Sequence, residues 1–280
     1  MLPGVYADTD AWRELAPWDR YLAKVHAVSA RHPELVICGP SAAALRGVSL
    51  ARSNDPVHVL DPRGTGRVFG AVKTVTSQDV REIETVEGIL LTSSADTIVD
   101  VVRGSTPGIG LAYADALLRR DPTLTIAQVQ AINEARISSR NRRRARWALE
   151  RATGIPESVL ESLSLAIMEF GGFELPELQI VFRSEGWEDH ADFFWRHLDL
   201  IGESDGDVKY SGAFGDPLDA IRAEKRRETR LRRRVSAHLR WGWPEIRQPD
   251  LLTTMLQTAR VPRVGQPDQV MLASLRQALR

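Results

Sequence analysis

Apolar positions change their spacing several times along the first half of the chain, and each change predicts a different element. Between Asp19 and Ala30 they recur at helical spacing, which predicts an amphipathic helix. Short apolar runs bounded by Gly, Pro and Asp predict strands at 35–38, 57–60, 72–75 and 88–92. Helix is predicted at 41–45 and at 94–102, with Ser94 as the cap of the second. Residues 110–149 have helical composition throughout, with a turn at Asp121-Pro122-Thr123, a helix capped by Thr125 and a further helix over the arginine segment. We therefore expect residues 1–153 to form a mixed α+β domain with a helical end.

The pattern changes again after Gly154-Ile155-Pro156, which marks the predicted domain boundary. Helix is predicted for 157–170. Strands are predicted at 178–183, at 189–195 and at 198–204. A long helix at 217–234, a strand at 235–241 and a helix at 245–260 follow. Residues 154–280 are thus predicted to form an α/β domain: helix, three-stranded meander, helix, strand, helix.

Composition narrows the class of protein without choosing a function. Hydrophobic residues make up 43% of the chain and charged residues 26%, which is ordinary for a globular protein. The apolar runs are too short to cross a bilayer, and the N-terminus lacks the pattern of a secretory signal. The single cysteine, Cys38, lies in an apolar stretch and has no partner for an internal disulfide. These features fit a cytoplasmic protein without a membrane contact.

The formal net charge is zero, but basic residues are concentrated in two segments. The first contains Arg136, Arg140, Arg142, Arg143, Arg144, Arg146 and Arg151. The second contains Arg222, Lys225, Arg226, Arg227, Arg230, Arg232, Arg233 and Arg234. Such blocks can track a phosphate backbone because the local field steers binding. Either block alone is equally typical of a solvated helix face, so together they favour nucleic acid only modestly.

Three acidic residues fall on two strands that are expected to be neighbours. Glu203 and Asp205 alternate along one strand and should project the same way, and a short connection at Arg196 and His197 should place Asp192 beside them. Carboxylates crowded in this way require a cation or take up protons. Hard oxygen ligands suit Mg²⁺ or Mn²⁺. The alternative is that these are ordinary acidic residues at strand ends, with Asp205-Gly206 as a turn.

The second half resembles a bacterial domain related to the very-short-patch-repair endonucleases, within the PD-(D/E)xK nuclease superfamily. The pieces that carry the resemblance occur in order: Glu161-Ser162-Leu163-Ser164, Leu175-Pro176-Glu177-Leu178-Gln179, Ala191-Asp192-Phe193-Phe194-Trp195, Gly202-Glu203-Ser204-Asp205-Gly206, Val208-Lys209-Tyr210, Glu224-Lys225-Arg226-Arg227-Glu228 and Leu239-Arg240-Trp241. This resemblance implies a restriction-endonuclease-like fold and hydrolysis of phosphodiester bonds with Mg²⁺ or Mn²⁺ as cofactor.

Residue by residue, the resemblance implies that Asp192 and Glu203 are metal ligands and that Glu161 completes the shell or orients water. Asp205 stands where the superfamily usually places a catalytic lysine. Lys225, or else Lys209, is expected to supply the missing ammonium. Arg226 is a further candidate for phosphate contact.

The first half resembles the AbiEi-type antitoxins of type IV toxin–antitoxin systems. The matching pieces are Gly4-Val5-Tyr6, Gly39-Pro40-Ser41-Ala42-Ala43-Ala44-Leu45-Arg46-Gly47, Val57-His58-Val59, and Leu91-Thr92-Ser93-Ser94-Ala95-Asp96-Thr97-Ile98-Val99-Asp100. In those relatives a winged helix-turn-helix precedes the Gly-Val-Tyr strand, and here the sequence starts at that strand. The resemblance implies DNA as a partner and a cognate toxin as a further one. The first basic segment supplies Arg142 and Arg143 as candidate DNA contacts.

Three functions remain open at this point. The first is a Mg²⁺-dependent DNA endonuclease that uses Glu161, Asp192, Glu203, Asp205 and Lys225. The second is a transcriptional regulator or antitoxin that binds DNA without cutting it. A third possibility is an interaction module that uses a nuclease fold only as a scaffold, because a fold does not fix a function. The sequence does not give the oligomeric state.

Overall fold

The computed structural model describes residues 5–61, 68–184, 186–205, 227, 229–231 and 234–280. The chain divides into two compact units, Met1–Gly154 and Ile155–Arg280. Both combine helices with a mixed sheet, which confirms the predicted α/β character. No described helix has the length and apolar character that crossing a membrane requires.

The first unit contains a sheet of six short strands in the order β3-β4-β2-β1-β6-β5. The strands are β1 (Val36–Ile37), β2 (Val57–Leu60), β3 (Val68–Phe69), β4 (Val72–Val75), β5 (Ile83–Val86) and β6 (Ile89–Thr92). Pairs β1·β6 and β2·β4 are parallel and the others antiparallel. Glu87 and Gly88 join β5 to β6 with φ values of 50° and 79°, and two positive φ angles are what a two-residue hairpin turn needs.

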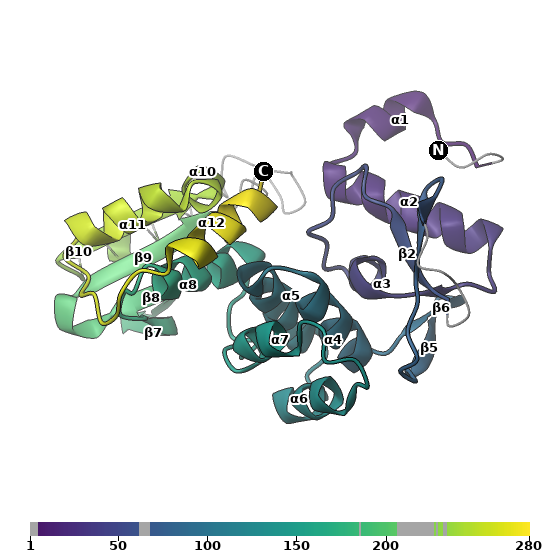
Figure 1. Cartoon of the computed structure of the whole chain (residues 1–280). Coiled ribbons are helices and arrows are strands. Elements are labelled where there is room, and N and C mark those ends of the chain that lie inside the picture. The colour runs from purple at the N-terminus through teal and green to yellow at the C-terminus, as the bar shows by residue number, and fades with distance from the viewer. Residues whose placement is uncertain (1–4, 62–67, 185, 206–226, 228, 232–233) are drawn as a thin grey trace. The chain divides into compact units, whose positions relative to one another are not determined.

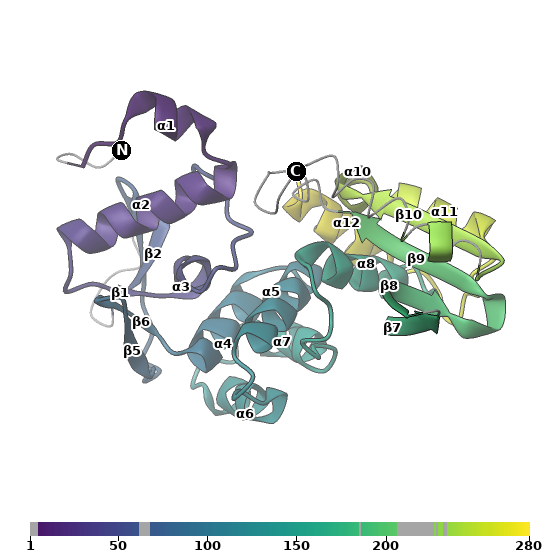
Figure 2. The same cartoon turned by 180° about the vertical axis from the view of Figure 1, so that it is seen from behind.

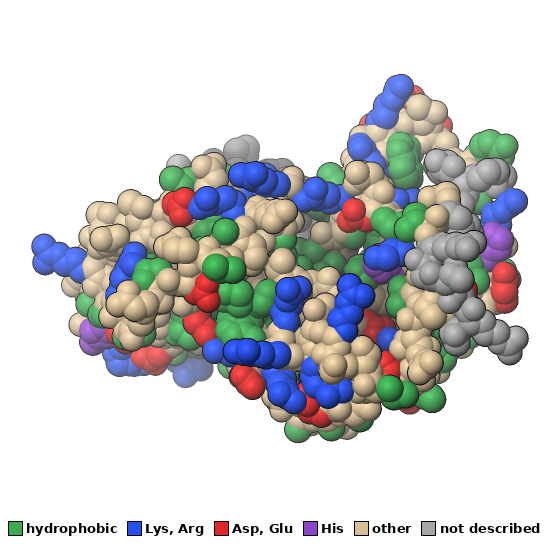
Figure 3. All heavy atoms as spheres, viewed as in Figure 1, with side chains coloured by type: hydrophobic (Ala, Val, Ile, Leu, Met, Phe, Trp, Pro, Cys, Tyr) green, Lys and Arg blue, Asp and Glu red, His purple; other side chains and the backbone are tan. Residues whose placement is uncertain are grey.

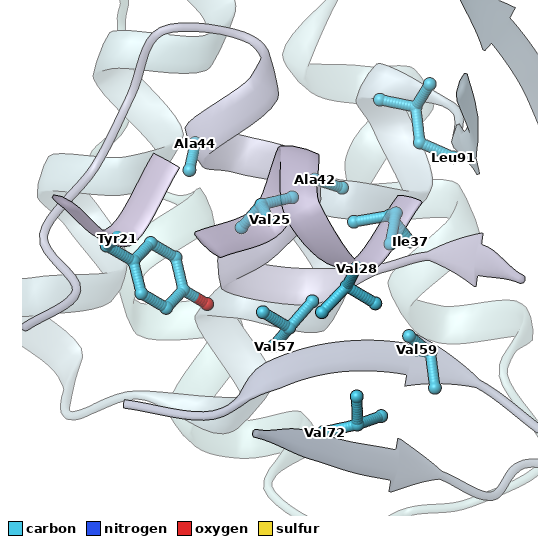
Figure 4. Packing of buried hydrophobic residues seen from close by; sticks show 10 residues of the cluster. All are labelled: Tyr21, Val25, Val28, Ile37, Ala42, Ala44, Val57, Val59, Val72 and Leu91. Carbon is cyan, nitrogen blue, oxygen red and sulfur yellow. The ribbon is translucent and has the colours of Figure 1, made fainter. Parts of the chain in front are cut away.

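Three helices accompany the sheet, namely α1 (Thr9–Glu14), α2 (Pro17–Arg31) and α3 (Gly39–Leu45). Residues of α2, α3 and four strands form one apolar core, in which Tyr21 and Val25 are fully buried (Figure 4). The Tyr21 hydroxyl lies 2.6 Å from Oγ of Ser41, and the same Oγ accepts a hydrogen bond from the His58 amide at 2.8 Å. One buried hydroxyl thus links α2, α3 and strand β2.

The helical end of the first unit consists of α4 (Ser94–Gly104), α5 (Pro107–Arg120), α6 (Ile126–Ala135) and α7 (Arg142–Leu149), labelled in Figure 1. Ser93 caps α4 through the Asp96 amide, one residue before Ser94, with which the predicted helix begins. Thr125 and Gln128 form a capping box at the start of α6. Two carboxylates of α4 are paired with guanidinium groups: Arg81 binds Asp100, and Arg136 binds Asp96.

The second unit has a four-stranded sheet in the order β10-β9-β8-β7, visible from both sides in Figures 1 and 2. Its described elements are α8 (Val159–Phe170), β7 (Glu177–Ser184), β8 (Trp187–Trp195), η1 (Arg196–Leu198), β9 (Leu200–Asp205), β10 (Ala237–Gly242), α10 (Trp243–Arg247), α11 (Pro249–Thr258) and α12 (Gln269–Ala278). Strands β7, β8 and β9 form an antiparallel meander, and β10 is parallel to β9. Helix α8 contacts β9 as well as α10, α11 and α12, so it lies between the sheet and these helices.

Several predicted elements differ from the structure. Val5 and Tyr6 lie outside any strand, and Tyr6 is 91% exposed, so the strand predicted from Gly4-Val5-Tyr6 is wrong for the residues described. The helix predicted for 245–260 is interrupted at Pro249, where a second helix begins. Helices α1 and α12 were not predicted. Most of the helix predicted for 217–234 lies outside the described residues.

Candidate functional site

The four predicted carboxylates lie on three elements of the second unit. Glu161 is in the first turn of α8, Asp192 is on β8, and Glu203 and Asp205 are on β9. The β8·β9 ladder runs from Trp195↔Leu200 to Phe193↔Gly202. Asp192 precedes Phe193 on β8, and here a side chain takes the place of a backbone acceptor. Oδ2 of Asp192 accepts hydrogen bonds from the backbone amide and Oγ of Ser204 at 2.9 and 3.3 Å.

Hydrogen bonds and register identify the face on which Asp192 lies. Ser204 is in register with Trp241 of β10, and the Trp241 indole donates to Oγ of Ser164 on α8 at 2.8 Å. Paired residues of neighbouring strands point to the same side of a sheet, so the Ser204 side chain faces α8. Asp192 therefore belongs to the α8 face, where its charge acts on Glu161.

Glu161 is a buried carboxylate at this face, 5% exposed. Ser158 caps the helix by accepting the Glu161 amide proton, which fixes the position of the glutamate. Oε2 of Glu161 accepts from the Glu157 amide and from Nε2 of Gln179, both at 2.8 Å. Burial raises the pKa of Glu161, and the nearby Asp192 raises it further, which outweighs these hydrogen bonds. The surroundings of Glu161 thus disfavour its charged form relative to that of an exposed glutamate.

Glu203 precedes Ser204 on β9 and so points to the other face of the sheet. Its Oε2 lies 3.2 Å from Nε2 of His238, and its Oε1 lies 2.8 Å from Nη2 of Arg227. Burial alone would raise the pKa of Glu203, but His238, Arg227 and Arg240 together lower it below its usual value. These neighbours therefore favour the anionic form of Glu203.

Asp205 forms a two-contact ion pair with Arg240, in which Nη2 donates to Oδ1 at 2.8 Å and Nε donates to Oδ2. Arg240 is in register with Glu203 on the adjacent strand. Glu203 and Asp205 thus face the same group of histidine and arginine side chains, and the prediction that they project to one side is confirmed.

The prediction that Asp192 shares this side is wrong. With regular alternation, Asp192 would pair with Glu203 and both side chains would point to the same face. The regular pairing is interrupted at this position, and Gln179 in the neighbouring strand β7 has a φ of 51°. The Asp192 carboxylate instead bonds to Ser204 and lies near Glu161. The three carboxylates consequently do not converge on one side of the sheet.

The fit of these residues to a divalent metal can be judged from their neighbours. Among the residues that the structure describes, no group of three or more His, Cys, Asp or Glu side chains could hold a metal ion. Glu203 and Asp205 already bind guanidinium or imidazole groups, so the positive charge a metal would supply is present in the chain. The described geometry therefore does not fit the predicted ligand set of Asp192, Glu203 and Glu161.

The predicted nucleic-acid contacts are divided between the two units. Lys209, Lys225 and Arg226 lie outside the described residues. Arg142 is half-buried and donates to the Arg136 carbonyl, which ties the start of α7 to the preceding loop. Arg143 is exposed on α7.

Helix α7 presents a basic surface because its apolar and basic positions separate. Ala145, Ala148 and Leu149 are buried, whereas Arg143 and Arg144 are exposed. Arg140, just before the helix, is also exposed, and within the described ranges none of these three arginines has an ion-pair partner. Lys and Arg side chains gather over α5 to α7 in the lower middle of Figure 3. We call Arg140, Arg143 and Arg144 the basic α7 surface.

Sequence reasoning did not identify His238 and Arg240 as partners of the carboxylates. Their signal was present, because polar His238 and Arg240 alternate with apolar Leu239 and Trp241 along the last strand. Such alternation predicts one polar face toward the acidic strand.

No family model matches the chain, and comparisons with curated proteins and with solved structures find no match. The two resemblances described above therefore remain predictions from the residues. Function must accordingly be inferred from the charged groups and their geometry.

Proposed function

We propose that the chain binds DNA without hydrolysing it, as a regulator of the antitoxin type. The observation that carries this proposal is the basic α7 surface, where Arg140, Arg143 and Arg144 are exposed and unpaired within the described part of the chain. Arginine is well suited to phosphate because its planar guanidinium offers several donors to phosphate oxygens. Such a role would place the protein in the cytoplasm, and a cognate toxin is a further partner that the resemblance suggests.

Binding without cleavage is favoured by the surroundings of the acidic residues. Asp192 and Glu203 lie on opposite faces of their sheet, and the Glu203 and Asp205 carboxylates are already bound by His238, Arg227 and Arg240. The helix, the β7–β9 meander and the parallel β10 nevertheless support a restriction-endonuclease-like arrangement for this unit. We propose that this arrangement now serves as a scaffold.

Titration of labelled duplex DNA with the full chain at several salt concentrations tests the proposal. Arg143→Gln and Arg144→Gln should each weaken binding and reduce the slope of log K against log salt by about 1 for each phosphate that is no longer bound. Arg196→Gln is the matched control, because Arg196 is also exposed but is paired with Glu177. Binding should persist in a chelator. No binding at low salt, or equal effects of all three substitutions, would reject this DNA-binding surface.

A second candidate function, a Mg²⁺- or Mn²⁺-dependent endonuclease, is favoured by one observation. Glu161 and Asp192 are close enough for Asp192 to raise the pKa of Glu161, and a bound divalent cation relieves such repulsion. In that case Lys225 or Lys209 would supply an ammonium near the phosphate, with Arg226 as a further contact. Mg²⁺ would stabilise the charge that develops on the phosphate.

Incubation of duplex and single-stranded DNA with the chain and Mn²⁺, Mg²⁺ or chelator separates the two candidates. The regulator predicts intact DNA under all conditions. The endonuclease predicts cleavage that Asp192→Asn and Glu161→Gln abolish, and that Arg143→Gln does not abolish at saturating protein. Metal-dependent cleavage with this pattern would replace the first proposal by the second.

A further inference from the structure

The first unit contains a cavity of about 490 Å³ whose lining includes several charged side chains. One wall comes from the sheet region, including Gly39, His58 and Lys73, and the other comes from the helical end, including Arg103 and Arg140. A volume of this size is typical of sites for small ligands and is far below what a DNA duplex occupies. The cavity is therefore distinct in kind from the basic α7 surface, although Arg140 borders both.

Cationic side chains outnumber carboxylates in the lining. Lys73, Arg81, Arg103, Arg136 and Arg140 are cationic, whereas Asp79 and Asp100 are acidic.

Part of this charge is compensated within the wall. Arg81 contacts both carboxylate oxygens of Asp100, at 2.9 and 3.0 Å. Arg136 binds the buried Asp96 and lies 3.6 Å from Asp100. The remaining cations, Lys73, Arg103 and Arg140, have no carboxylate partner within the described ranges.

Arg103 is held firmly by neutral groups. Its Nε donates to Oδ1 of Asn133 at 2.7 Å, and its Nη1 donates to the Ser138 carbonyl at 2.6 Å. These acceptors orient the guanidinium and leave its full positive charge. In addition, Nε of Arg136, a residue 5% exposed, is buried without a hydrogen-bond partner among the described atoms. An unmet donor of this kind costs free energy unless a ligand or water accepts from it.

Lys73 and His58 form a pair at the opposite wall. They are in register on β4 and β2, so their side chains lie side by side. Burial, followed by the charge of Lys73, lowers the pKa of His58 to about 4 despite the opposing charge of Asp55. The imidazole is thus neutral at pH 7, with one donor and one acceptor nitrogen. Gly39 has a φ of +53°, and a Cβ there would lie 3.6 Å from Nδ1 of His58, so a side chain would reduce the space beside the ring.

We propose that this cavity binds a small phosphorylated metabolite, with the phosphate held between Lys73, Arg103 and Arg140. The excess of cations calls for an anion, and the donors on two walls suit the several oxygens of a phosphate. The neutral imidazole of His58 is an additional hydrogen-bonding group for the ligand. This assignment is independent of whether the protein binds or cleaves DNA.

Isothermal titration calorimetry of the full chain with inorganic phosphate, ADP and adenosine tests the assignment. Inorganic phosphate and ADP should bind and raise Tm, whereas adenosine should do neither. Lys73→Gln and Arg140→Gln should each weaken ADP binding by about tenfold or more. Arg140 is exposed, so its substitution does not endanger folding, and circular dichroism checks both variants. Arg143→Gln is the matched control, because Arg143 is exposed nearby but does not line the cavity.

Three results would overturn the proposal. The first is no heat and no Tm shift with phosphate or ADP at about 10 mM, a concentration above any useful Kd. The second is equal weakening by Arg143→Gln, which would indicate diffuse attraction without a defined site. The third is displacement of ADP by duplex DNA combined with equal loss of DNA binding in Lys73→Gln, which would assign these cations to the DNA backbone.

Discussion

Glu161 and Glu203 are carboxylates of similar burial on opposite faces of the same sheet, and their surroundings differ. Glu161 receives hydrogen bonds from an amide and a glutamine, and the charge of Asp192 lies close by. Glu203 is bracketed by an imidazole and a guanidinium. The pKa of the first is raised and that of the second is lowered. Burial alone therefore does not decide the charge state of an acidic residue, and the neighbouring groups do.

This difference between the two faces bears directly on function. The residues that most resemble a nuclease site on β9 are already neutralised by the chain, whereas the α8 face carries two nearby carboxylates. A search for metal binding should consequently begin at Glu161 and Asp192, and not at Glu203. Substitutions that remove individual charges can test how strongly each buried carboxylate depends on its hydrogen-bond and ion-pair partners.

The largest effect on stability is expected where a buried carboxylate loses the guanidinium group with which it is paired. In the first unit, Arg136→Met leaves the buried Asp96 without its ion-pair partner. We expect the free energy of unfolding to fall by about 3–5 kcal/mol, because an uncompensated buried charge remains. Hydrogen exchange of α4 and α6 during urea titration measures this for the first unit alone. Arg146→Met, which breaks an exposed pair with Glu134, is the control and should behave like the native chain.

A smaller loss is expected for His238→Leu, about 2 kcal/mol. In this variant Glu203 keeps Arg227 as a partner. The buried Nδ1 of His238 has no hydrogen-bond partner in the described structure, so the substitution removes fewer stabilising interactions than Arg136→Met does. Denaturant unfolding followed by exchange in β9 and β10 measures it. His190→Leu is the control because His190 is exposed. Equal stabilities of these two variants would mean that His238 does not compensate Glu203.

Opposite pH dependences are expected for Glu161→Gln and Glu203→Gln, each with an effect of about 1 kcal/mol at pH 7. The raised pKa of Glu161 means that the folded state binds its proton more tightly than the unfolded chain does. Stability is therefore lost as pH rises above the usual glutamate range, and Glu161→Gln should stabilise the protein at pH 7 but not at pH 4.

The lowered pKa of Glu203 has the opposite sign. Its contribution to stability is present above the unfolded pKa and is lost as pH falls toward the folded one, so Glu203→Gln should destabilise at pH 7 and less so in acid. Unfolding free energies of both variants from pH 4 to pH 8 provide the measurement. Parallel curves for the two would contradict the difference between the faces.

The smallest effect is expected for Arg196→Gln, which removes a two-contact pair with Glu177 at distances of 2.8 and 2.7 Å. Both side chains are largely exposed, so water and salt screen their attraction. We expect little change in Tm, and none in 1 M salt. A clear loss of stability would show that exposed pairs matter as much here as buried ones.

Much of the fold follows from local patterns in the sequence. The alternation that predicts Glu203 and Asp205 on one side is a property of any regular strand, and the structure confirms it. Thr125 and Gln128 carry the cap of α6 in their own spacing. Strands β2 and β4 and helix α2 are likewise visible as apolar runs or helical periodicity in the sequence.

The position of Asp192 required tertiary information. Its side chain replaces a ladder hydrogen bond at Ser204, twelve residues away, next to a strand in which Gln179 has positive φ. No residue near Asp192 announces this interruption, so extrapolating the period of two placed it on the wrong face. Helix α12, whose N-cap is Asp268, was also missed, because it follows the Pro- and Gly-containing segment after Arg260.

The Ser41 hydroxyl, which joins the Tyr21 ring to the His58 amide, has a consequence for experiments on the first unit. The His58 amide can exchange its hydrogen only when this hydrogen bond opens, which requires His58 to move. A molecule that fills the adjoining cavity restricts that movement and should therefore slow deuterium uptake at the His58 amide. The exchange rate of this one backbone amide, measured by nuclear magnetic resonance, can therefore report whether the cavity is occupied, without an attached probe.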